Sequence, residues 1–293
     1  MGEVLEQKQE KTKAVLLMLL SALSFAFMAA LVKLLQDIPV FEKVFFRNFV
    51  ALFIALSWVL KKKLPILGEK QHQKYLLARS LLGATGMVLY FYAITNLLLA
   101  DSAMLNKLSP FFVTIFAVIF LKEKITQIRI ITLAVAFAAA LIIIKPRFDL
   151  SILPALAGLG SAVFAGAAYT MVRYLRDKEA PATIVFYFAA VSTLIMLPLM
   201  LMNFKMPNLT QIVFLIGTGL FAAIGQFSLT YSYKYAPASE VAIYNYANIL
   251  FSAIIGYVLW YEVSDILSII GGFLIISMSV LNFWETNIKK RVD

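Results

Sequence analysis

The sequence has no cysteine and only one histidine, His72. The lack of cysteine excludes disulfides, thiolate metal sites and cysteine nucleophiles. His72 lies in the polar run 68–74, and a lone histidine in such a run is typical of a solvated loop side chain. We therefore expect no metal ion and no cofactor.

Charge is also scarce, because 14% of the residues are charged and 62% are hydrophobic. A soluble domain is about 45–50% apolar and about 25% charged. A soluble protein this apolar would expose large sticky patches. Ten spans of roughly 20 residues each would take up nearly all of the chain and leave no soluble catalytic domain. The composition therefore predicts an integral membrane protein.

Ten long apolar segments follow one another along the chain. The predicted spans are 14–36, 41–60, 75–96, 98–121, 126–144, 151–174, 182–202, 210–233, 237–260 and 264–284. Each is continuously apolar, whereas a barrel strand alternates over about ten residues, so helices are indicated. The first segment has no evident small-residue cleavage site, and we expect no cleaved signal peptide.

The net charge of +10 is distributed unevenly between the two sides of these spans. With a cytoplasmic N-terminus, nearly all loop lysines and arginines lie inside, the exceptions being Lys145, Arg147 and Lys205. This bias is typical of membrane topology rather than of nucleic-acid binding. It predicts a protein of the cell membrane with both termini in the cytoplasm.

The second half of the sequence repeats the first. A shift of 139 residues places Asp101 on Glu240, Asn106 on Asn245 and Glu123 on Glu262. Five helices per half is an odd number, so the second half must be inverted. The predicted fold is an all-α integral membrane protein with ten transmembrane helices as two inverted five-helix repeats, residues 1–147 and 148–293. Such repeats are common in secondary transporters, whose substrate site lies near the midplane.

Three stretches of the first half resemble a known family. They are LADSA at 99–103, LSPFF at 108–112 and FLKEK at 120–124, echoed by APASE at 236–240 and WYE at 260–262. Together with the ten spans, they resemble the drug/metabolite transporter superfamily, in its EamA-type branch. The second copy has Ile249 in place of Pro110 and Tyr261 in place of Lys122. The resemblance implies export or exchange of amino acids, nucleotide-like compounds, other metabolites or drugs.

Ionisable side chains inside apolar segments are candidate functional residues. Arg47 lies about seven residues into the second span, roughly 10 Å deep. Arg47 and Lys107 would favour a substrate with a carboxylate or a phosphate. The alternatives for Arg47 are a structural partner such as Glu42, or snorkelling to the surface. We expect Arg79, which lies near a span end, to snorkel.

Uncharged polar residues provide further candidates for substrate contact. Asn245 and Asn248 share one helical face, and Asn106 occupies the register of Asn245 in the first half. They either line a cavity or hold the helices together. Four tyrosines are candidates for stacking or hydrogen bonding: Tyr92, Tyr169, Tyr231 and Tyr244. Asp101 and Glu240 open the fourth and ninth spans, where they either complement the helix dipole or serve in proton coupling or gating.

These features favour a secondary transporter that moves a small polar metabolite, such as an amino acid or nucleoside-like compound, by alternating access. A lipid flippase or scramblase is the alternative. The sequence has no Walker-type loop and no clustered histidines or carboxylates within the spans, so we expect neither ATP drive nor an enzyme. The expected partners are the substrate and membrane lipid, not nucleic acid, and the sequence is compatible with a homodimer.

Overall fold

The computed structural model describes residues 2–122, 125–145, 150–175, 178–236 and 241–292. Within these residues, ten helical segments are long and apolar enough to cross a membrane. The α-helices are α1 (Gly2–Leu34), α2 (Val40–Lys61), α3 (Gln73–Asn96), α4 (Leu99–Asn106), α5 (Ser109–Leu121), α6 (Gln127–Ile144), α7 (Leu153–Leu175), α8 (Pro181–Met202), α9 (Leu209–Tyr235), α11 (Ala247–Trp260) and α12 (Ile266–Val292). Short 3-10 turns η1 (Lys70–His72), η2 (Leu150–Ile152) and η3 (Ala242–Tyr246) precede α3, α7 and α11.

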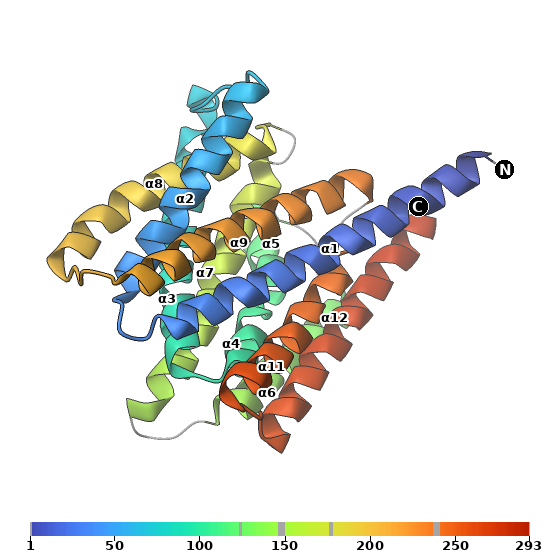
Figure 1. Cartoon of the computed structure of the whole chain (residues 1–293). Helices are drawn as coiled ribbons and strands as arrows, with labels where there is room; N and C mark the ends of the chain where they lie inside the picture. Colours follow the sequence, from blue (N-terminus) through green and yellow to red (C-terminus); the bar gives the residue numbers. More distant parts are fainter. Residues whose placement is uncertain (1, 123–124, 146–149, 176–177, 237–240, 293) are drawn as a thin grey trace.

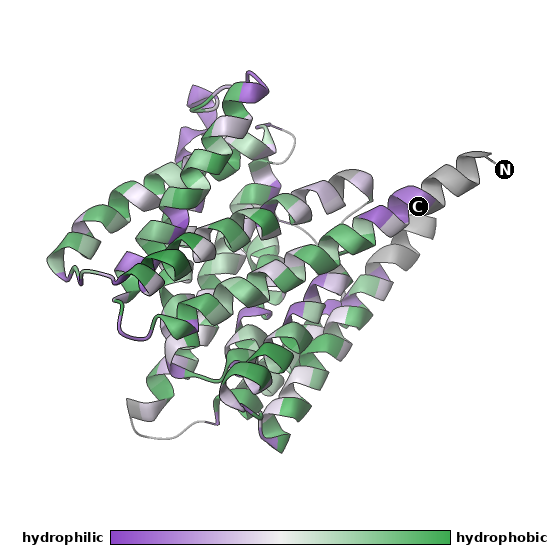
Figure 2. Cartoon of the chain, viewed as in Figure 1, coloured by the Kyte–Doolittle hydropathy of each residue, from purple (hydrophilic) through white to green (hydrophobic). Residues whose placement is uncertain are grey.

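The helices form one bundle, and α1 begins and α12 ends on the same side of it (Figure 1). Hydrophobic residues cover most of the length of the helices, and hydrophilic residues gather towards helix ends and loops (Figure 2). The predicted spans are confirmed, but α1 begins at Gly2 and α12 continues to Val292, well beyond the predicted ends. Both extensions are rich in glutamate, glutamine or lysine, which favour helix, and neither contains a proline to stop it.

The two halves of the chain run in opposite directions. We call the face with the chain ends the terminal face and the opposite face the distal face. Helix α1 runs from the terminal to the distal face, whereas α7, the first helix of the second half, begins next to the distal end of α6. The predicted inversion is therefore confirmed, while its boundary at residues 147 and 148 lies outside the described residues.

Packing between the halves follows a two-fold symmetry. The α1–α9 contact is matched by α3–α7, the α2–α9 contact by α3–α8, and the α1–α11 contact by α5–α7. Two further contacts join equivalent helices and lie on the axis, namely α2–α8 and α6–α12, and the α4–α11 contact joins the fourth span to the ninth. An axis in the membrane plane relates the two halves, as inverted transporter repeats require.

Two unusual backbone conformations obey the same symmetry. Lys122 ends α5 with a φ of 55°, and Tyr261 ends α11 with a φ of 56°. Positive φ is uncommon for residues other than glycine. Its occurrence at equivalent positions indicates that the two repeats share detailed backbone geometry, although lysine and tyrosine differ chemically.

The fourth and ninth spans, predicted at 98–121 and 237–260, are confirmed, but within the described residues neither is one continuous α-helix. Helix α4 ends at Asn106 and α5 begins at Ser109. Pro110 explains this break, because it has no N–H and its ring clashes with the carbonyl of Asn106. In the second half, η3 precedes α11 although Ile249 replaces the proline. Non-helical backbone at membrane depth occurs where it is buried in protein or lines a cavity.

Candidate functional site

The two broken segments meet at Lys107 and Asn245. Nζ of Lys107 donates to Oδ1 of Asn245 at 3.1 Å, and Oη of Tyr246 lies 3.5 Å from the carbonyl oxygen of Lys107. Lys107 lies eight residues after the start of α4, roughly 12 Å below the distal face. The structure thus brings two predicted site residues together, one from each half, in the interior of the bundle.

The other two predicted asparagines bind neighbouring helices. Nδ2 of Asn106 donates to Oγ of Ser161 in α7 at 3.1 Å. Nδ2 of Asn248 donates to the carbonyl oxygen of Ala22 in α1 at 2.9 Å, and Asn248 is buried. Each bond joins the broken span of one half to the first helix of the other. This geometry matches the interhelical role that the sequence left open.

A second cluster lies in a cavity of about 20 Å³ between α2, α3, α8 and α9. Its lining includes Arg47, Arg79, Phe188 and Gln226. Both arginines are 8% exposed, and their guanidinium carbons lie 5.9 Å and 3.8 Å from the centre of the Phe188 ring. The prediction that Arg79 snorkels is wrong, because α8 covers its side chain.

Neither guanidinium has an acidic partner among the described residues. Glu42, the predicted structural partner of Arg47, instead accepts from the backbone N–H of Lys205 at 3.2 Å. Nη1 of Arg47 donates to Oδ1 of Asn48 at 2.8 Å. Nε of Arg47, and Nε and Nη1 of Arg79, are buried without an acceptor in the described part of the chain. Two cations with free donors therefore face one small cavity.

The four predicted tyrosines lie in different surroundings. Tyr92 and Tyr244 are exposed. Tyr231 packs edge-on against Trp58, with ring centres 5.6 Å apart. Tyr169 is 47% exposed, and it lies within electrostatic range of both Arg47 and Arg79. Of the four, Tyr169 is the one that the structure associates with the arginine cavity.

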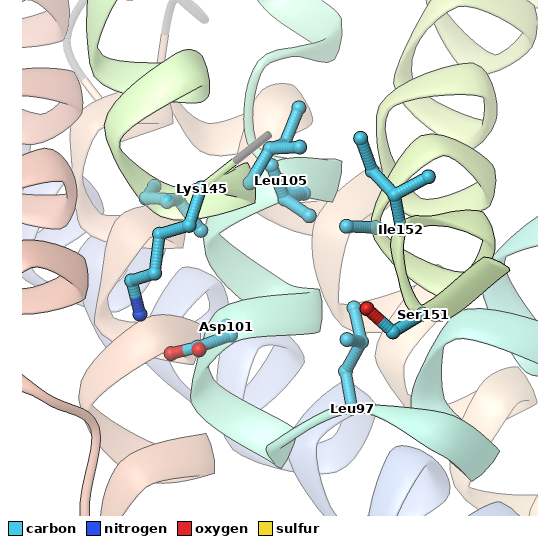
Figure 3. Close-up of a pocket in the computed structure, with 9 residues that line it drawn as sticks. Leu97, Asp101, Leu105, Lys145, Ser151 and Ile152 are labelled. Atoms are coloured by element: carbon cyan, nitrogen blue, oxygen red, sulfur yellow. The ribbon is translucent and has the colours of Figure 1, made fainter. Parts of the chain in front are cut away.

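A larger pocket of about 200 Å³ lies near the distal face, between α4, α6 and α7 (Figure 3). Asp101 lines it, and this carboxylate is buried and accepts hydrogen bonds from Oγ of Ser264 at 2.8 Å and Oγ of Ser268 at 3.1 Å. The side chain of Lys145 extends towards Asp101 but binds Asp265. Glu240, the predicted counterpart of Asp101, lies outside the described residues.

Lys145 also affects the electrostatics outside the membrane-spanning segments. Its ammonium donates to Asp265, and this hydrogen bond holds the pKa of the Asp265 carboxyl below its usual range. Asp265 accepts a further bond from the backbone N–H of Ser268 at 2.9 Å. The pair joins the end of α6 to the start of α12, and so connects the two halves at the distal face.

A largely buried ion pair joins the two halves at the distal end of the bundle, next to this pocket. Lys33 of α1 pairs with Glu262, and its Nζ also donates to the carbonyl oxygen of Leu97 at 2.6 Å. Oε2 of Glu262 accepts from the backbone N–H of Leu99 at 2.9 Å. We call Lys33, Glu262, Leu97 and Leu99 the distal lock, because they join α1, the start of α4 and the end of α11.

His72 is not the solvated loop side chain that the sequence predicts. It is buried on the terminal face, and its Nδ1 lies 2.8 Å from Oε1 of Glu179. The same oxygen accepts from the backbone N–H of Glu69 at 2.8 Å. The prediction failed because the partner of His72 comes from the other half of the chain, where nothing in the local sequence indicates the contact.

Comparison with known proteins identifies relatives over nearly the whole chain. The model of the EamA-like transporter family matches residues 12–145 and 152–284, one copy in each half. The pseudopaline exporter CntI of Pseudomonas aeruginosa is 38% identical over 265 residues, which cover 89% of this chain and 93% of that protein. The human solute carrier family 35 member G1 is 27% identical over 279 residues, covering 89% of this chain and 76% of that protein.

Two further comparisons agree. A riboflavin transporter of Vibrio cholerae is 30% identical over 185 residues, which cover 62% of each chain. A solved crystal structure of a protein superposes with a TM-score of 0.63 at 15% identity, covering 92% of this chain and 97% of that one, and it supports the fold alone. This chain therefore belongs to the EamA-like transporter family, and it is an integral membrane protein that transports a small molecule.

Proposed function

We propose that the protein exports a small polar metabolite across the cell membrane by alternating access, with both termini in the cytoplasm. The contact between Lys107 and Asn245 is the observation on which this proposal rests. It joins two broken spans, one from each inverted half, and broken spans of this kind form the substrate sites of secondary transporters. The excess of lysine and arginine on the terminal face supports the orientation, and the similarity to an exporter supports the direction.

Two-fold symmetry supplies the second state of the cycle. The distal lock holds α1, α4 and α11 together in the observed state. Because the halves are equivalent but inverted, exchanging their conformations would open the distal face. We expect the ion pair between Lys33 and Glu262 to separate in that second state.

Asp101 is the proposed site of proton coupling. Its carboxylate lines the distal pocket, and it binds hydroxyl groups rather than a cation among the described residues. Lys145 and Asp265 act on its charge with opposite signs, and these two side chains bind each other. An acid in this position gains or loses a proton without breaking an ion pair. Its bonds to Ser264 and Ser268 would transmit that change from α4 to α12.

Counterflow in proteoliposomes tests the proposed transport. Vesicles loaded with unlabelled amino acids, nucleosides and small carboxylic acids, one compound at a time, are mixed with the labelled form. Wild-type protein should exchange at least one compound. Lys107→Met should reduce exchange at least tenfold, since it removes the contact with Asn245, and the exposed-loop control Lys205→Met should not. Movement of labelled phospholipid without exchange of any soluble compound would contradict the proposal.

A further inference from the structure

Two buried arginines share one aromatic ring and one cavity, although they come from different helices. Their burial removes them from water, and the nearest partners are Phe188 and the amide oxygen of Asn48. An isolated charge in an apolar interior is costly unless it is paired and fully hydrogen-bonded. This protein places two such charges side by side. Their burial destabilises the folded state, so the stability of the fold does not account for them.

We infer that the cavity between Arg47, Arg79 and Phe188 binds a carboxylate group of the transported molecule, an inference that rests on the proposed transport function. Three buried donor atoms remain without acceptors: Nε of Arg47, and Nε and Nη1 of Arg79. A guanidinium presents its N–H groups in a planar fork that matches the two oxygens of a carboxylate. An anion here would supply the missing acceptors and neutralise the repulsion between the two cations.

The size of the cavity favours a single small group. Its volume of about 20 Å³ is sufficient for a water molecule or one carboxylate oxygen. A bulkier phosphate, with more oxygens to accommodate, would require a larger opening. We therefore expect one carboxylate oxygen to enter the cavity, while the rest of the molecule extends towards the neighbouring polar side chains, such as Gln226 of the cavity lining.

Gly83 makes the close approach of Arg79 and Phe188 possible. A Cβ at this position would lie 2.6 Å from Nη1 of Arg79 and 2.9 Å from Cε2 of Phe188. Both distances are too short for a side chain to be tolerated without displacement. The glycine of α3 thus leaves room for the guanidinium of Arg79 to lie over the ring of Phe188 in α8. The local sequence therefore fits a positioned arginine rather than one that reaches the surface.

Thermal unfolding of the purified full-length protein tests the inference with acid and amide probes of the same shape. The probe pairs are glutarate with glutaramide, succinate with succinamide, and nicotinate with nicotinamide, so that each amide probe carries no carboxylate. At least one acid should raise the unfolding midpoint of the wild type, and its amide should not. Arg47→Gln and Arg79→Gln should abolish the shift in the midpoint that the acid causes. Arg47→Lys should weaken binding of the acid about tenfold. The control Arg129→Gln should show the same acid-induced shift as the wild type.

The midpoint without any probe separates binding from packing. If the arginines serve to bind an anion, removing one uncompensated charge in Arg79→Gln should leave the midpoint unchanged or raise it. A fall of several degrees would show that Arg79 serves packing, and would overturn the inference. An equal shift with acids and amides, no shift with any of the three acids, or a retained shift in both glutamine variants would also overturn it.

Counterflow distinguishes this inference from the proposed function. Exchange of a carboxylate-bearing compound at the wild-type rate by Arg47→Gln would preserve the carrier and overturn the carboxylate site. A shift in the midpoint with an acid, but no exchange of any compound, would preserve the carboxylate site and contradict the carrier.

Discussion

Two groups of buried cations in the same bundle have opposite surroundings. Lys33 is 5% exposed and pairs with Glu262, while Arg47 and Arg79 are 8% exposed and have no carboxylate partner in the described part of the chain. The three cations are therefore buried to nearly the same extent, and they differ in whether a carboxylate pairs with them. The chain is able to supply an acid to a buried cation, and it does so at the distal face.

This difference separates residues that hold the observed conformation from residues that are available to a ligand. A paired cation strongly resists the loss of its partner, because the remaining charge is stranded. An unpaired one gains when an external anion arrives. Four changes test this difference, from the largest expected effect to the smallest. They remove the cation of the Lys33–Glu262 pair, the proton-binding group of Asp101, the space that Gly83 leaves for Arg79, and the exposed pair of Asp265 with Lys145.

Breaking the distal lock should have the largest effect on stability. Lys33→Met leaves the carboxylate of Glu262 buried without its cation, and removing one partner of a buried pair costs about 3–5 kcal/mol. Denaturant unfolding in detergent micelles measures this loss. The control Lys205→Met, at an exposed position, should change stability by less than about 0.5 kcal/mol. If Lys33→Met and Lys205→Met were equally stable, the pair with Glu262 would not stabilise the fold, and the comparison between paired and unpaired cations would fail.

Asp101→Asn should remove the effect of a pH gradient on transport while keeping exchange. One coupled proton corresponds to about 1.4 kcal/mol, or about tenfold accumulation, per pH unit across the membrane. Asparagine binds no proton; its Oδ1 accepts from one of the two serines, and its Nδ2 donates to the hydroxyl oxygen of the other. Uptake with and without a gradient of one pH unit, beside counterflow at equal pH, provides the measurement. Gradient-driven accumulation by the variant at the wild-type level would exclude Asp101 as the coupling group.

Gly83→Ala should weaken substrate binding by about fivefold, corresponding to about 1 kcal/mol, the lower end of the cost of overpacking. The added methyl group would displace Arg79 from Phe188. The KM for counterflow measures the effect. Gly160→Ala is a matched control, because its added Cβ would meet only the flexible end of Leu89 at 3.2 Å. An unchanged KM in Gly83→Ala would argue against the position of Arg79 in the site.

Asp265→Asn should have the smallest effect, less than about 1 kcal/mol, because the pair with Lys145 is exposed to solvent. The folded protein holds the pKa of Asp265 below its ordinary value. The ion pair therefore stabilises the folded protein at any pH above the ordinary pKa, and this contribution is lost as the pH falls through the lowered pKa. The difference in midpoint between wild type and variant should be constant from pH 8 to about pH 5 and shrink below about pH 4. A difference that grows with acidity would contradict this assignment.

Much of the fold follows directly from the sequence, because spans and inversion depend on hydrophobic length and on an odd number of helices per half. The break at Lys107 was also readable in principle, since Pro110 removes a backbone donor. The corresponding break before α11 was not, because Ile249 stands at that position and η3 is held by packing against α1. Tertiary contacts, rather than local sequence, determine that break.

The site was only partly predictable for a related reason. Repeat symmetry singled out Asn245, and depth singled out Lys107 and Arg47. The position of Arg79 close to the start of α3 predicted a side chain near the membrane surface. In the structure, Phe188 of α8 covers it. Because α8 belongs to the other half of the chain, the sequence around residue 79 gives no indication of this contact. Partners that come from the opposite repeat require coordinates.

The cysteine-free chain allows a direct test of alternating access. Lys33→Cys and Glu262→Cys together place two thiols at the distal lock, and a bifunctional thiosulfonate reagent, which forms a reducible disulfide with each thiol, would join α1 to the segment after α11. Counterflow should stop in the cross-linked double variant and return on reduction, while each single variant should retain counterflow after treatment with the reagent. Undiminished counterflow by the fully cross-linked protein would contradict a cycle in which the distal face must open.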